Sequence, residues 1–254
     1  MGNDIKVIHK ASDLLHCLIH GAKGLMEIAE LMGNGKGTTH RLLNSLKNTG
    51  LVAQNPKTKK YLLGPGFILL QKRAGTEYDA LLAAAEAPME HLREIFNETI
   101  ELHVPVGGYR LCIAECASTQ LIRFTSGIGV KAPIYTGSAG KVLLAYMDEK
   151  ARGKLLQDIV LVKVADNTIT DKKVLDQHIQ NTITNGYAVS FGERANGAAG
   201  ISIPILSTGI AIASLSVLSP QIRVDMDKLI SMIPEMTKAA KTIEHAFDAY
   251  TSNR

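Results

Sequence analysis

The sequence predicts an α+β protein in which a winged helix-turn-helix precedes a larger domain with a central antiparallel sheet. Within residues 22–61, an apolar-periodic helix, a glycine-broken turn, a second helix and a basic hairpin follow one another, which is the plan of a winged helix-turn-helix. Strand-like and helical segments mix from Thr99 onward. The charge is also divided: residues 1–76 hold 11 Lys and Arg against 4 Asp and Glu, and the remainder holds 17 against 20. Net charges of +7 and −3 therefore make up the total of +4. This division indicates that only residues 1–76, here called the head, contact a polyanion.

Length and composition narrow the class of protein. A chain of 254 residues can form two ordinary domains, and 46% apolar with 20% charged residues is typical of a globular protein. No apolar run approaches the roughly 18 residues of a membrane span, and the N-terminus has no signal-peptide core. Three widely placed cysteines fit a reducing compartment. We therefore expect a cytoplasmic protein with no membrane partner.

The head is predicted element by element from apolar spacing. The first helix, amphipathic, is expected over residues 5–20. The second has an apolar stripe made of Leu25, Ile28, Ala29 and Met32. The third turns inward a face that contains Thr39, Leu42, Leu43 and Leu46. Strands at 51–54 and 60–63 form the wing. A short helix from Phe67, ending near Gly75, links the domains. The predicted boundaries are 1–65 for the head, 66–77 for the linker helix and 78–254 for the second domain.

The second domain opens with a helix at 79–96 that we expect Pro88 to interrupt. Alternating patterns then predict the other elements. The expected strands are 100–104, 109–114, 121–124, 187–191, 199–204 and 210–218. The expected helices are 137–147, 150–156, 172–185 and 225–250.

Polar side chains on the third helix and the wing have the chemistry that duplex DNA requires. Arg41 can pair bidentately with guanine and Asn44 can read adenine, while Lys36 and Thr38 lie at the helix start, where backbone N–H groups favour a phosphate. Lysines of the wing suit backbone contact. The candidate DNA-binding residues are Lys36, Thr38, His40, Arg41, Asn44, Lys47, Lys57 and Lys59, with Lys60 beside them. The alternative, that each is an ordinary solvated residue, stays open.

Three stretches together resemble the IclR family of bacterial transcriptional regulators. They are residues 35–52 followed by 61–64, residues 133–145, and residues 186–193 continuing through Gly197 and 203–204 to 215–217. The resemblance implies a winged helix, a linker helix and an effector domain of GAF-like fold. It also implies homodimers or homotetramers on paired half-sites of a double-stranded DNA operator. The family usually has proline and serine where this chain has Gly35 and Gly37, so we expect either a flexible helix start or a close backbone–phosphate approach.

The resemblance also implies where a small-molecule effector binds. The implied positions are Leu121, Phe124, Ser138, Ala139, Gly140, Ser190, Ala198, Gly200, Ser216 and Leu218. Backbone amides at the helix start of 137–140 could hold a carboxylate. Ser190 replaces an acidic residue of the members that bind small acids, and Gly200 and Leu218 replace a cysteine and a serine. We therefore expect a roomier, more apolar pocket and an aromatic or otherwise partly apolar carboxylic acid.

Other residues leave alternatives open. Glu193 either holds the loop before Gly197 or contacts the effector. Cys112 and Cys116 should face one side of a strand as small apolar fillers, so no metal is expected, although some family members carry one. No cofactor is expected either, because the phosphate-loop resemblances at 33–38 and 140–142 lack the required order of residues.

Three functions are compatible with these features. The first is a ligand-responsive transcriptional regulator of a catabolic or metabolic operon. The second is a small-molecule enzyme whose head only oligomerises, although no catalytic triad or paired-carboxylate set is visible and Ser138 has only Lys141 as a neighbouring base. The third is a DNA-binding protein that has lost its ligand response.

Overall fold

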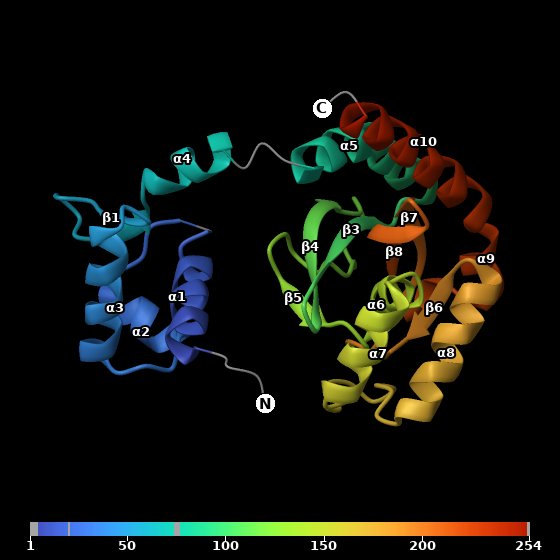
Figure 1. Ribbon diagram of the computed structural model, residues 1–254, viewed down its shortest axis with the longest axis horizontal. Coiled ribbons are helices and arrows are strands. Elements are labelled where there is room, and N and C mark those ends of the chain that lie inside the picture. The colour runs from blue at the N-terminus through green and yellow to red at the C-terminus, as the bar shows by residue number, and fades with distance from the viewer. Residues whose placement is uncertain (1–4, 20, 74–76, 253–254) are drawn as a thin grey trace. The chain divides into compact units, whose positions relative to one another are not determined.

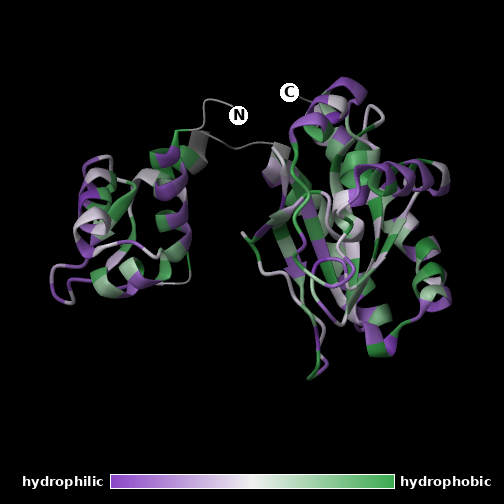
Figure 2. Ribbon diagram, turned by 90° about the horizontal axis from the view of Figure 1, so that it is seen from below, coloured by the Kyte–Doolittle hydropathy of each residue, from purple (hydrophilic) through white to green (hydrophobic). Residues whose placement is uncertain are grey.

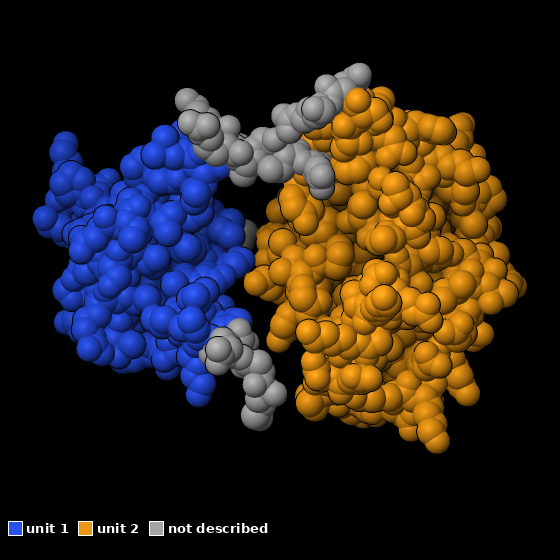
Figure 3. Space-filling view, viewed as in Figure 1, with its two compact units in different colours: residues 1–76 blue, residues 77–254 orange. Residues whose placement is uncertain are grey.

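The computed structural model describes residues 5–19, 21–73 and 77–252 and divides the chain into two compact units, residues 1–76 and 77–254 (Figures 1 and 3). Helix α4 (Gly66–Arg73) occupies most of the predicted linker and belongs to the first unit. The predicted helix end near Gly75 lies outside the described residues. The domain limits at 65 and 77 stay predictions. Among the helices that the structure describes, none is long and apolar enough to cross a bilayer.

The first unit is a winged helix-turn-helix, as predicted. Its elements are α1 (Lys6–Cys17), α2 (Leu25–Leu31), α3 (Lys36–Asn48) and the antiparallel pair β1 (Val52–Gln54) and β2 (Tyr61–Leu63). One apolar cluster holds them together. It contains Leu14, Leu18, Ile28, Leu43, Leu46, Val52 and Tyr61. The helical spacing of these side chains is therefore what places α3 on the surface of a small core.

Polar groups shape the tip of the wing. The side-chain oxygen of Asn55 accepts hydrogen bonds from the backbone N–H groups of Lys57 at 2.9 Å and Thr58 at 3.0 Å. The Gln54 amide donates to the Lys59 carbonyl at 2.9 Å, and Lys59 itself has a φ of 58°. An Asx-type turn thus holds the hydrophilic tip, which is purple in Figure 2.

The second unit has a six-stranded antiparallel sheet in the order β5-β4-β3-β8-β7-β6. The strands are β3 (Thr99–Val106), β4 (Tyr109–Cys116), β5 (Lys131–Pro133), β6 (Ala188–Phe191), β7 (Ala198–Ser207) and β8 (Ile210–Pro220). The helices are α5 (Glu77–Phe96), α6 (Gly137–Ala145), α7 (Glu149–Asp158), α8 (Lys172–Asn185), α9 (Met226–Ser231) and α10 (Ile233–Thr251), with a 3₁₀ turn at Gln221–Arg223.

Helices cover both faces of this sheet. Helices α5 and α10 pack on one face, where Leu102, Ile201 and Leu215 join Met89 and Ile243 in the main core (Figure 1). Helix α6 packs on the other face against β6, β7 and β8, and α8 packs against α6. Polar strand residues on the α6 side are consequently enclosed rather than solvated.

Three expected elements differ in the structure. Residues 121–124 form no strand, because Leu121 and Ile122 are exposed and have no sheet to pack on. Helix α5 continues through Pro88, since burial of the neighbouring Met89 and Leu92 offsets the roughly 3 kcal/mol cost of proline within a helix. The helix expected at 225–250 divides into α9 and α10.

A β-bulge overturns the expectation that both cysteines of β4 face one side. The register between β3 and β4 shifts after Leu102, so Cys116 pairs with Ile100 whereas Cys112 pairs with His103. Cys116 packs against the main core. Cys112 instead lies on the α6 side of the sheet, where burial raises the pKa of its thiol to about 12. One extra residue in a strand reverses the facing of every side chain beyond it.

Replacing Gly140 with alanine should destabilise the second unit. A Cβ at this position would lie 1.9 Å from the Ile134 carbonyl oxygen, a backbone atom that cannot easily move away. We expect a loss of roughly 1–3 kcal/mol or more in the free energy of unfolding, measured by urea denaturation with circular dichroism. The matched control is Gly153→Ala in α7, where a Cβ meets nothing within 4 Å and should stabilise by about 0.5–1 kcal/mol. Equal midpoints for the two variants would contradict this close packing.

Candidate functional site

Helix α3 presents a buried face and a polar face. Thr39, Leu43 and Leu46 are buried against the core of the first unit. The predicted contact residues Lys36, Thr38, His40, Arg41 and Lys47 are exposed, and Asn44 is half-buried. The structure therefore places all the predicted α3 contact residues where they can reach a ligand without disturbing the core.

The start of α3 is unobstructed. Gly35 is the residue before the helix, and no side chain caps the first turn. A Cβ added at Gly35 or Gly37 would meet nothing within 4 Å, so neither glycine is required for packing inside the chain. Both explanations for the glycines, flexibility and a close phosphate approach, stay predictions.

The wing adds a second basic element. Lys57, Lys59 and Lys60 are exposed at its tip, which the Asn55 turn holds in shape. Lys23 pairs with Tyr61 of β2 in an isolated bridge, and its ammonium group contacts Glu27 at 3.0 Å. The wing is thus fixed to the same core as α3.

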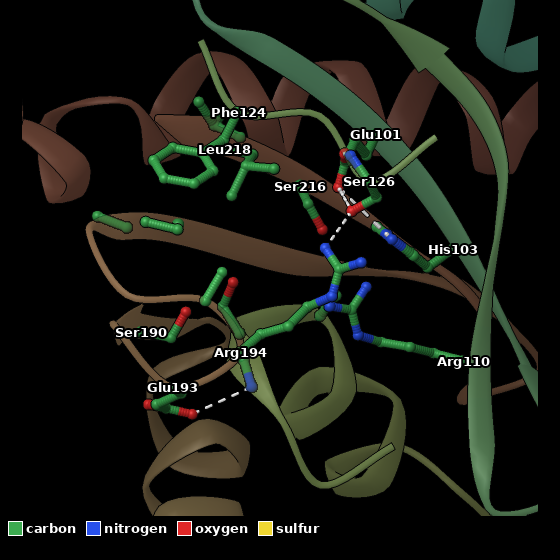
Figure 4. A pocket seen from close by; sticks show the side chains of 18 of the residues that line it. Glu101, His103, Arg110, Phe124, Ser126, Ser190, Glu193, Arg194, Ser216 and Leu218 are labelled. Carbon is green, nitrogen blue, oxygen red and sulfur yellow. Dashed lines mark hydrogen bonds and ion pairs between the residues drawn. The ribbon is translucent and has the colours of Figure 1, made fainter. Parts of the chain in front are cut away.

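The second unit has a cavity of about 240 Å³ between α6 and the sheet (Figure 4). Eight of the predicted effector residues line it. They are Phe124, Ser138, Ala139, Ser190, Ala198, Gly200, Ser216 and Leu218. They come from α6, β6, β7, β8 and the segment that follows β4, so distant parts of the sequence meet here.

Two predicted effector residues are not among those lining the cavity. The side chain of Leu121 is 99% exposed, because residues 121–124 do not form the expected strand. Gly140 is buried against the backbone of Ile134, where its lack of a side chain permits close packing of α6. For both positions a role in effector binding stays a prediction that the lining of this cavity does not support.

The cavity also contains charged residues that the sequence did not assign. Arg110, Arg194, Glu101 and His103 all line it. Arg194 donates to the Ser126 hydroxyl at 2.7 Å, and Ser126 donates to Glu101 through its hydroxyl at 2.9 Å and its backbone N–H at 2.6 Å. Figure 4 shows this chain of contacts. The expectation of a more apolar pocket is therefore wrong at one end of the cavity.

Arg110 is a buried cation that Glu101 attracts, but one of its nitrogen atoms has no hydrogen-bond acceptor among the described residues. Its side chain lies on the enclosed face of β4, the whole residue is 5% exposed, and its Nε atom has no hydrogen-bond acceptor. Burial and the nearby Arg194 lower the pKa of Arg110 to about 10, which still leaves it charged at neutral pH. Two guanidinium groups that repel each other in an enclosed space favour an anion between them.

His103 lies beside the arginines and is neutral at physiological pH. Burial, Arg110 and Arg194 hold its pKa well below the usual range, and neither ring nitrogen has a hydrogen-bond partner. Its Nε2 atom lies 3.5 Å from a Glu101 oxygen. Across the described ranges, no three His, Cys, Asp or Glu side chains gather in a metal-binding group.

A buried ion pair fixes the start of α6. Lys141 donates to Glu193, and also to the Val189 carbonyl at 2.7 Å. The other Glu193 oxygen accepts from the Gly137 backbone N–H at 3.1 Å. Glu193 both lines the cavity and joins α6 to the loop after β6, so the structural alternative for this residue has direct contacts to support it.

Three serine hydroxyls connect α6 to the sheet. Ser202 donates to Ser138 at 2.8 Å and lies 2.7 Å from the Ser216 hydroxyl. All three side chains are buried, and Ser202 was not predicted. In this arrangement Ser138 accepts a hydrogen bond and keeps its own O–H proton to donate.

Two family profiles match the chain in order. The profile of the IclR helix-turn-helix domain matches residues 7–56, and that of the bacterial transcriptional regulator IclR C-terminal domain matches residues 76–245. The HTH-type transcriptional regulator KipR of Bacillus subtilis is 26% identical over 245 residues, covering 96% of this chain and 97% of KipR. The regulator KdgR of Escherichia coli is 28% identical over 221 residues, covering 87% of this chain and 84% of KdgR.

A solved structure has the same fold. The IclR homolog of Microbacterium hydrocarbonoxydans, crystallised in complex with 4-hydroxybenzoate, superposes with a TM-score of 0.77 at 22% identity. The match covers 96% of this chain and 99% of that one. With an exposed polar face on α3 in the first unit, a cavity in the second and both profiles matched, the chain belongs to the IclR family of bacterial transcriptional regulators.

Proposed function

We propose that this chain regulates a catabolic or metabolic operon by binding an operator with its first unit and a small carboxylic acid with its second. The observation that carries the proposal is the cavity of the second unit, where Arg110 and Arg194 provide positive charge in an enclosed space. The complex of the Microbacterium homolog with 4-hydroxybenzoate adds support, because that ligand is an aromatic acid.

The chain acts as a homodimer or homotetramer in this proposal. One chain presents one reading helix, α3, so two chains are needed to read paired half-sites of a useful length. An acid bound in the second unit shifts the arrangement of the paired heads, and hence their fit to the operator spacing.

The contacts in the cavity favour a binding role over catalysis. The Ser138 hydroxyl accepts a hydrogen bond from Ser202, so its partner is another hydroxyl and not a base. Lys141, its neighbour in the sequence, is paired with Glu193. A serine nucleophile needs an adjacent general base, and these contacts do not provide one.

Arg41→Ala should weaken binding to selected DNA far more than binding to random DNA. A bidentate contact to a base is worth about 1–3 kcal/mol of discrimination, whereas phosphate contacts remain. The measurement is fluorescence anisotropy on duplexes selected by the wild-type protein from a random pool. Unchanged affinity for the selected duplex in both Arg41→Ala and Asn44→Ala would contradict the assignment of α3 as the reading helix.

Lys57→Gln should weaken binding to all duplexes and reduce its salt dependence. Each lost phosphate contact lowers the slope of log K against log salt by about 0.9. Lys154→Gln is the matched control, because this lysine is exposed on α7 of the second unit. Equal slopes for the two variants would exclude the wing from the DNA contact.

An acid that binds the second unit should change the affinity of the full chain for selected DNA. Allosteric coupling is typically about 1–3 kcal/mol, or roughly 5- to 150-fold in the dissociation constant. Calorimetry identifies a binding acid, and anisotropy with that acid at saturation measures the change. A bound acid that leaves DNA affinity unchanged would show that the second unit has lost its regulatory role.

A further inference from the structure

The cavity has a cationic end and an apolar end. Figure 4 shows Phe124 and Leu218 on the opposite side of the pocket from Arg110 and His103. Its volume of about 240 Å³ is below the roughly 300–1,000 Å³ of pockets for drug-sized ligands. A molecule that satisfies both ends is therefore small and has a charged group on one side and an apolar body on the other.

Arg110 has a buried Nε donor with no acceptor among the described residues, although the charge of Glu101 attracts its guanidinium group. Buried charges in proteins are normally paired, because an unpaired one loses its hydration without compensation. Glu101 is the nearest candidate, but both of its oxygens accept hydrogen bonds from Ser126, which also accepts from Arg194. Arg110 thus points into the cavity with no acceptor of its own among the described side chains.

The start of α6 is a weaker receptor for a carboxylate. Its first N–H, from Gly137, already donates to Glu193. The Ser138 hydroxyl already accepts a hydrogen bond from Ser202, so it can offer a ligand only its own single proton.

The charges around the cavity match one negative charge on the ligand. Arg110 and Arg194 contribute +2, and Glu101 contributes −1 in its carboxylate form. Burial raises the pKa of Glu101, while Arg110 and the hydrogen bonds from Ser126 oppose that shift. Glu193 and Lys141 neutralise each other. The resulting +1 favours a monoanion over a dianion.

We infer that Arg110 and Arg194 together form the receptor for the carboxylate of a single-ring aromatic or similarly apolar monocarboxylic acid, whose ring lies toward Phe124 and Leu218. The inference rests on the proposed function and specifies which end of the bound ligand contacts the arginines. Arg110 is the residue that determines specificity for acids, because its buried Nε atom gains a hydrogen-bond acceptor on binding.

The test is isothermal titration calorimetry on the full chain with benzoate, its neutral isostere benzamide and the dianion terephthalate. Benzoate should bind the wild type more tightly than either of the others. Arg110→Gln should weaken benzoate binding roughly 10- to 100-fold, as expected for the loss of a charge-assisted contact, and leave benzamide binding unchanged. Arg123→Gln, which removes an exposed arginine that does not line the cavity, is the matched control and should bind benzoate as the wild type does.

Thermal unfolding of the ligand-free variants separates a binding role from a structural one. Because the cost of burying the Arg110 charge outweighs its attraction to Glu101, Arg110→Gln should raise the midpoint of the second unit by about 2–4 °C. A lower midpoint, or equal benzoate affinity in Arg110→Gln and the wild type, would overturn the inference. Tight binding of glyoxylate or pyruvate and none of benzoate would overturn it too, but regulation of DNA binding by those acids would leave the proposed function intact.

Discussion

The buried Lys141–Glu193 ion pair is the contact on which the geometry of the second unit depends. It joins α6 to the loop after β6, and the same carboxylate accepts a hydrogen bond from the first backbone N–H of α6. Close packing at Gly140 holds the helix against the chain entering it. Burial lowers the pKa of Lys141, but the charge and the hydrogen bond of Glu193 oppose that shift. The ion pair thus offsets part of the cost of burying the ammonium group. Because the charges of Lys141 and Glu193 cancel each other, the positive charge that remains in the cavity comes from Arg110 and Arg194.

The fold could be predicted from the sequence where local pattern determines it. The apolar stripes of α2 and α3, the wing and the order of most strands and helices all follow from periodicity. Segment 121–124 shows the limit of this reasoning, since its apolar residues have strand-like composition but no sheet to pair with. Pro88 shows another, because tertiary burial outweighs a local penalty that sequence reasoning treats as decisive.

The candidate site was predictable on one side only. Ser138, Ser190 and Gly200 follow from motifs of the family, whereas Glu101, His103 and Arg110 lie in strands whose alternation resembles that of an ordinary solvent-exposed face. Only the tertiary structure reveals that α6 covers this face. The β-bulge after Leu102, which places Cys112 with His103, likewise leaves no clear signal in the sequence. Polar residues at alternate positions of a strand are ambiguous until the layer above the sheet is known.

In the proposed function the two units share one linked equilibrium, in which an acid in the second unit and DNA on the first alter each other's affinity. Linkage requires this effect to be reciprocal. The most direct measurement is calorimetric titration of benzoate into the full chain, with and without saturating selected duplex. The account predicts that duplex changes the benzoate dissociation constant by the same factor by which benzoate changes the DNA dissociation constant. The same benzoate affinity in both titrations would contradict it.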